Sequence, residues 1–147
     1  MASLANLIKQ QIKTDLDALV SSGILGSVTE QDLSKDALEN DYPAYPAAIL
    51  GMAQTESRYE ESRANLRTYT FPIMVLQKWE ETITPEDTEE LVDTILNKFD
   101  DDFDLQGMSV GGLEATVTPA APASTVDKTY VYFLVIIKAK ALYQLSN

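Results

Sequence analysis

The stretch DKTYVYFLVIIKAKAL, from Asp127 to Leu142, contains the longest apolar run in the chain, Tyr130 to Ile137. Eight consecutive apolar residues place apolar side chains on both faces of an extended strand, which is typical of a strand covered on both sides. From Lys138 onward apolar and polar residues alternate, as in a strand with one face in solvent. The run is far shorter than the roughly 20 residues of a membrane-spanning helix, so we expect a core strand and no membrane partner.

A second long strand is predicted from Leu66 to Trp79, where apolar and polar residues alternate. Its apolar face carries Tyr69, Phe71, Ile73, Val75 and Trp79. Pro72 has no backbone N–H to donate, so we expect this strand at an edge of the sheet or beside a bulge. The remaining expected segments are a strand at Ala47 to Ala53, a strand at Ser109 to Thr118, and a mobile hairpin tip at Pro119 to Thr125.

Two helices are predicted from apolar residues spaced three and four positions apart. Ser3 can cap the start of the first helix, and Gly23 can end it in a left-handed conformation. The second helix begins at Thr84-Pro85, because threonine is a good N-cap and proline suits the first helical position. Aspartates at a helix carboxyl end oppose the helix dipole, so we expect this helix to end near Asp100.

The order of these elements predicts an α+β fold in which two helices pack on a four- to five-stranded, mostly antiparallel sheet. A length of 147 residues fits a single domain, residues 1–147. Met1 to Gln10 contains one lysine and no continuous apolar segment, so we expect no export signal and folding in a cytoplasm.

The chain contains no cysteine and no histidine, which excludes thiolate nucleophiles, histidine triads and the common zinc sites. Asp100, Asp102 and Asp104 occupy the first, third and fifth positions of a calcium-binding EF-hand loop. However, Leu105 and Gly111 replace the glycine and the glutamate that such a loop requires. We therefore expect no enzyme activity, no catalytic residue, no cofactor and no metal site.

The formal net charge is −12, and the residues from Glu80 to Asp104 contribute most of it. A chain this acidic is repelled by nucleic acid over most of its surface, because nucleic-acid binders need clustered basic residues. Asp100, Asp101, Asp102 and Asp104 are candidates either for a solvated face or for a surface that repels a nearby polyanion.

The segment from Gln54 to Asn65 is polar or charged except for Tyr59 and Ala64. It can form a helix with pairs four residues apart, or a long hairpin that projects from the sheet. Its basic residues either pair within the chain or contact another subunit. The candidate interface residues are Arg58, Tyr59, Arg63 and Arg67.

Several of these features occur together in a characteristic order. An N-terminal helix precedes Tyr42-Pro43-Ala44-Tyr45-Pro46, a charged excursion, the strand that begins near Asn65, and the acidic helix at Thr84-Pro85. Two closing strands follow. This arrangement, from about Leu4 to Leu142, resembles the tail terminator (tail completion) proteins of long-tailed bacteriophages.

The resemblance implies a non-enzymatic virion protein that assembles in the host cytoplasm as a homo-oligomer, a hexameric ring. Such a ring caps the tail tube protein, stops its polymerisation, meets the head–neck connector protein, and lets DNA pass through its lumen without specific binding. An acidic lumen would repel the DNA. The alternatives are another neck component, either a head–tail adaptor or a stopper, and an acidic cellular adaptor domain that binds a basic protein.

Overall fold

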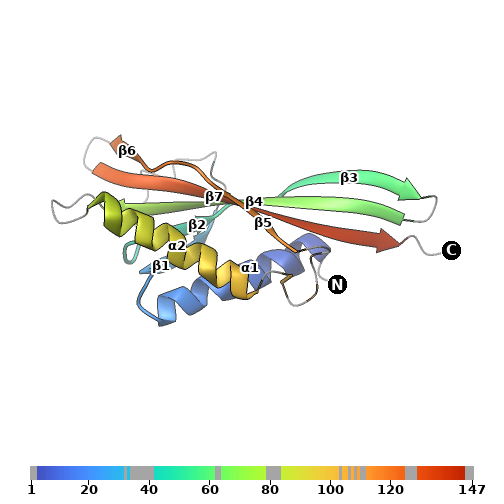
Figure 1. The fold of residues 1–147 in the computed structure, drawn as a ribbon, viewed down its shortest axis with the longest axis horizontal. Helices are drawn as coiled ribbons and strands as arrows, with labels where there is room; N and C mark the ends of the chain where they lie inside the picture. Colours follow the sequence, from blue (N-terminus) through green and yellow to red (C-terminus); the bar gives the residue numbers. More distant parts are fainter. Residues whose placement is uncertain are drawn as a thin grey trace.

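The computed structural model describes residues 3–31, 33, 42–61, 64–78, 84–102, 104–105, 107, 109, 112–124 and 129–144, with the backbone alone at 58–61, 64–65, 123–124 and 142–144. The elements in chain order are α1 (Leu4–Ser21), β1 (Ser27–Glu30), β2 (Ala47–Leu50), β3 (Gln54–Glu61), β4 (Ala64–Lys78), α2 (Pro85–Asp101), β5 (Glu114–Val117), β6 (Ala121–Ser124) and β7 (Thr129–Gln144) (Figure 1).

The described strands form one mixed sheet of seven strands in the order β1-β2-β4-β7-β5, with β3 also paired to β4 and β6 to β7. The α+β class is confirmed, but the expected count of four to five strands is too low. β1 pairs parallel with β2, and all other pairs are antiparallel. The two unexpected strands, β1 and β6, have four residues each, which is too short for a period to stand out in the sequence.

β4 and β7 are the two longest strands, and they pair antiparallel from Ala64↔Gln144 to Lys78↔Tyr130. These two strands form the centre of the sheet, and both helices lie on one of its faces (Figure 1). The predicted apolar face of β4 is confirmed from Tyr69 to Val75, and Trp79 lies outside the described residues. The buried residues that pack between sheet and helices include Ile8, Ile12, Leu16, Tyr69, Phe71, Ile73, Val75, Ile95, Phe133, Val135 and Ile137.

The other face of the sheet has a smaller core of its own. Tyr130 is fully buried there against Tyr42, Ala47 and Leu76. The hydroxyl groups of Tyr45 and Tyr130 lie 3.3 Å apart, so two polar groups at this core satisfy each other. This second core explains why the apolar run of β7 has apolar side chains on both faces of the strand.

The helix ends follow the predicted signals. The Ser3 hydroxyl accepts a hydrogen bond from the backbone N–H of Asn6, and Gly23 follows α1 with a φ of 81°. At α2, Thr84 and Asp87 form a reciprocal capping box, and Pro85 opens the helix. Neither described helix has the length and apolarity that crossing a membrane requires.

We expected Pro72 at an edge of the sheet or beside a bulge, but it lies in the interior strand β4, where the pairing with β7 runs without a shift in register. On the side of β4 that faces away from β7, the strand pairing is interrupted at this point, because β2 ends at Leu50 and β3 begins at Gln54. The Pro72 carbonyl accepts a hydrogen bond from the Gly51 N–H at 2.8 Å, so Pro72 faces this interruption. Since the N–H and C=O of a strand residue point to the same side, the missing N–H costs no bond to β7.

Gly26 connects α1 to the sheet at a place with no room for a side chain. Its N–H donates to the Pro46 carbonyl at 2.8 Å, and a Cβ at this position would lie 2.7 Å from backbone atoms of Ala44 and Tyr45.

We expect Gly26→Ala to lower the free energy of unfolding by about 1–3 kcal/mol, because the backbone must move to admit the methyl group. Urea unfolding followed by circular dichroism measures this loss. The control is Ser21→Ala at an exposed helical position, where a change within about 0.5 kcal/mol is expected. An equal effect of both substitutions would contradict the prediction.

Candidate functional site

The first candidate surface is a three-stranded arm made of β3 and the parts of β4 and β7 that continue alongside it, residues 64–70 and 138–144. The arm extends beyond both helices (Figure 1). Of the two conformations considered for Gln54 to Asn65, the hairpin is therefore the one adopted. A strand is favoured here because β4 offers a continuous ladder, with Gln54 opposite Thr70 and Arg58 opposite Leu66.

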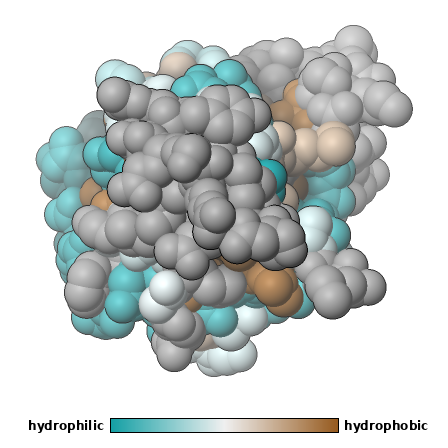
Figure 2. Space-filling model, turned by 90° about the vertical axis from the view of Figure 1, so that its right-hand side faces the viewer, coloured by the Kyte–Doolittle hydropathy of each residue, from teal (hydrophilic) through white to brown (hydrophobic). Residues whose placement is uncertain are grey.

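The arginines predicted as one interface do not share one face of the arm. Arg58 pairs with Leu66, whereas Arg67 pairs with Ser57, so Arg58 and Arg67 hold positions on opposite faces. Tyr59 pairs with Asn65, which places it on the face of Arg67. Arg63 lies outside the described residues. Viewed from the end where the arm projects, the described surface is mainly hydrophilic, with hydrophobic residues in separate patches (Figure 2).

The second candidate surface is the acidic segment around α2. Most of its described acids are exposed, including Asp100 and Asp101, and Asp104 is half-buried. The prediction that Asp102 belongs to an exposed acidic surface is wrong, because this residue is buried, with only 8% of its surface exposed. It caps the carboxyl end of α2 and faces α1, where Gln11 Nε2 donates a hydrogen bond to Asp102 Oδ2 at 2.9 Å. A solvated or polyanion-repelling surface in this region therefore excludes Asp102.

A second carboxyl group accompanies Asp102 in the interior. Asp15 of α1 is only 6% exposed and is hydrogen-bonded to Asp102. The pKa of Asp15 is raised to about 7, mainly because burial disfavours its charged form. The hydrogen bond and the negative charge of Asp102 raise this pKa as well, while the positive charge of Lys98 lowers it. The two carboxyl groups thus stay together by sharing a proton.

Sequence reasoning missed Asp15, although the sequence carries a signal for it. Asp15 falls on the apolar stripe of the first helix, between Ile12 and Leu19 at spacings of three and four. An acid at such a position needs a buried partner or a proton. The Asp15 Oδ2 atom is buried without a hydrogen-bond partner among the described residues, which fits a carboxyl group held close to neutral.

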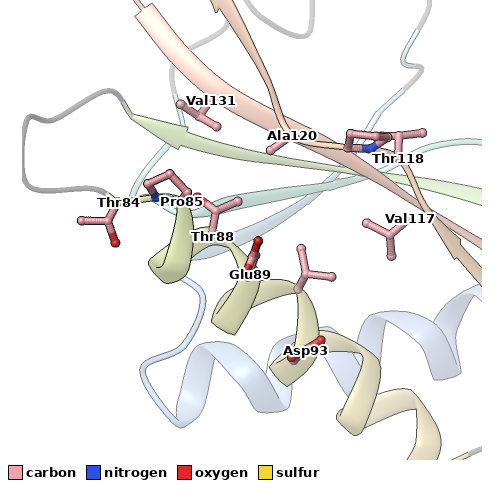
Figure 3. A pocket seen from close by; sticks show the side chains of 11 residues that line it. Thr84, Pro85, Thr88, Glu89, Asp93, Val117, Thr118, Ala120 and Val131 are labelled. Atoms are coloured by element: carbon pink, nitrogen blue, oxygen red, sulfur yellow. The ribbon is translucent and has the colours of Figure 1, made fainter.

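A third feature, which we call the α2–β5 groove, was not expected from the sequence. It has a volume of about 650 Å³ and lies between the first half of α2 and the joint that links β5 to β6 (Figure 3). Its lining consists of Thr84, Pro85, Thr88, Glu89, Val92, Asp93, Val117, Thr118, Pro119, Ala120 and Val131. Residues 121–124, expected to belong to a mobile tip, instead pair with β7 as β6, directly after the wall residues Thr118 to Ala120.

The wall of the α2–β5 groove is held in place by hydrogen bonds. On the sheet side, the Thr118 N–H donates to the Leu134 carbonyl at 3.0 Å, and the Thr118 hydroxyl accepts from the Leu134 N–H at 2.9 Å. On the helix side, the buried Thr88 hydroxyl donates to Gln77 Oε1 at 2.8 Å. Both walls are thus fixed to the central strands, and the groove is a preformed feature.

The arm, the acidic segment around α2 and the α2–β5 groove are all surface features. Within the described part of the chain, no three acidic side chains converge in a way that could hold a metal ion. No known family model matches the chain, and no curated protein matches it at a significant level. The described features that offer a surface for contact are the arm, the acidic helix α2 and the α2–β5 groove.

The buried carboxyl pair makes the stability of the protein depend on pH. The folded-state pKa of Asp15, about 7, lies above its ordinary value of 3.8, so the folded state binds more protons between these values. The stabilisation by the shared proton is complete below the ordinary value and is lost as pH rises through the folded-state value, with a slope of at most about 1.4 kcal/mol per pH unit.

Asp15→Asn replaces the titrating group by an amide that still donates to Asp102. We expect this variant to lose the decline in stability between about pH 4 and pH 7 that Asp15 causes in the parent protein. Guanidinium unfolding at a series of pH values gives the two profiles. Asp17→Asn, at an exposed position of the same helix, serves as the control and should keep the parent slope. Parallel profiles for the parent and Asp15→Asn would refute the shared proton.

Proposed function

We propose that this chain is a structural subunit of a long-tailed bacteriophage, a tail terminator that closes into a hexameric ring on the tail tube. The order of the elements supports the proposal. A helix precedes the proline-rich strand start at Tyr42 to Pro46, a charged excursion becomes β3, and the acidic helix α2 precedes the closing strands. These are the features on which the resemblance to tail terminators rests.

The observation that carries the proposal is the projecting arm. The first residues of β3, Gln54 to Ser57, are exposed, and within the described residues β3 pairs with β4 alone. An open strand edge is available for contact with a second chain. A contact between the arm of one copy and a different surface of the next copy is head-to-tail, and contacts of this kind generate closed rings when the rotation closes.

The charge of the molecule is compatible with a ring around DNA. Exposed acids are spread along α2 from Glu86 to Asp101. If this helix lines the lumen, like charges keep the duplex from adhering, with an effective range of about 8–10 Å at physiological salt. Asp104, just after the helix, is half-buried, and the buried Asp102 takes no part in this surface.

Charge reversal in the arm tests the proposal. In a phage that carries Arg58→Glu, Arg63→Glu and Arg67→Glu together, we expect a folded protein but over-long or unattached tails, because the charge-assisted contacts of the arm become repulsive. Negative-stain microscopy measures tail length and attachment. The matched control substitutes lysine at the same three positions, which preserves the charge and should preserve normal tails.

Other outcomes distinguish the alternatives. Normal tails and normal phage yield from the triple glutamate variant would disprove the role of the arm. Tails of correct length that fail to join heads would indicate an adaptor or a stopper of the neck. A stable monomer that associates with a basic cellular protein, and not with tails, would favour the adaptor domain.

A further inference from the structure

We propose that the α2–β5 groove is a docking site for an extended segment of another protein that carries a small aliphatic side chain two positions away from a lysine or arginine. The segment would pair with the outer edge of β5 and place its aliphatic side chain in the groove. This inference is independent of the phage assignment, because it rests only on the edge of the sheet, the groove and its charge.

The backbone of β5 provides the first reason. Because the Thr118 N–H bonds to β7, the alternation of a strand directs the backbone groups of Ala115 and Val117 away from β7. In the part of the chain that the structure describes, β5 is the last strand of the sheet on this side. The N–H and C=O groups of these two residues are therefore available to a further strand.

The groove provides the second reason, because it begins where this edge ends. Val117 belongs to both, and Thr118, Pro119 and Ala120 continue from the edge into the wall of the groove. Added strands gain specificity from pockets for alternate side chains. Val92 of α2 and Val131 of β7 also line the groove, and these apolar side chains suit an aliphatic group. Figure 3 shows Val131.

The charge of the rim provides the third reason. Glu89 and Asp93 line the groove from α2 and are both exposed, and none of the described lining residues is basic. An extended segment points every second side chain to the same face, so an aliphatic residue with a lysine or arginine two positions away would match both the apolar lining and the acidic rim, whereas an acidic segment would be repelled.

The positions of the basic residues in the fold favour a different protein as the partner. Among the described residues, the lysines and arginines lie within helices or within strands already paired in the sheet. Lys138 and Lys140, which do alternate with alanine, belong to β7 and pair with β4. Lys138 also pairs with Glu114 of β5, and the Lys140 N–H donates to the Ser109 hydroxyl at 3.3 Å, so this part of β7 is engaged on its other side as well. Arg58 of β3 does lie on an open strand edge, but no small aliphatic residue stands two positions away from it, since Glu56 and Glu60 occupy those positions.

Titration with two synthetic peptides tests the proposal. The probe is TKTVTRT, blocked at both ends, with its lysine, valine and arginine on one face of the extended chain, and its counterpart is TETVTET. With ¹⁵N-labelled protein, we expect TKTVTRT to shift the amide signals of Ala115, Val117 and Val92 in a saturable manner. TETVTET should bind at least about fivefold more weakly, because two favourable rim contacts become repulsive. A TKTVTRT peptide with its central backbone nitrogens methylated should lose binding, since it cannot pair with the edge.

Substitutions in the rim provide the matched comparison. Glu89→Lys combined with Asp93→Lys should weaken binding of TKTVTRT by at least about fivefold. Glu90→Lys, on the same helix but outside the groove, should leave the affinity within about twofold. The absence of saturable shifts, shifts confined to other surfaces, or equal affinity in the double variant would overturn the proposal. Concentration-dependent shifts of the same amides without peptide would also overturn it, because they would identify a second copy as the occupant.

Discussion

The pairing of β4 with β7 supports the rest of the structure. The two strands stay in register along all fifteen residues of β4, and each recruits further strands at its outer edge. β2 and β3 attach to β4, and β5 and β6 attach to β7. One face of this ribbon meets the helices, and the other meets the tyrosine-rich core around Tyr130. Because two strands of the arm, β4 and β7, continue from the body, its direction is set by the twist of one continuous ribbon.

The acidic residues of the molecule separate into groups with different physical roles. Acids in the first turn of α2 cap the helix and favour its dipole, and those on the exposed side keep a high negative potential at the surface. Glu89 and Asp93 extend this potential over an apolar groove. Asp15 and Asp102 lie in the interior, where a charge is costly and a shared proton is the cheaper arrangement. Position in the fold therefore decides whether a carboxyl group acts as a charge or as a hydrogen-bonding group.

The sites were harder to predict than the elements. The two long strands and both helices could be located because each has a local period or a capping residue that acts over a few positions. The candidate residues depend on longer relations. Arg58 and Arg67 lie near each other in the sequence, yet the register of β3 against β4 assigns them to opposite faces. Asp102 stands in a run of aspartates, yet it is turned inward because Gln11 and Asp15 of α1 meet it there.

The sequence alone determined the α+β class, the ends of both helices, the two-sided burial of β7 and the excess of negative charge, since these depend on composition and on local patterns. The tertiary structure decided the position of Pro72 opposite a break between β2 and β3, the conversion of the proline- and alanine-rich tip into β6, and the α2–β5 groove. Each of these needs contact between segments far apart in the chain. A hydrogen-bond ladder can accept a weak strand such as β6 only where a long neighbour such as β7 already offers its edge.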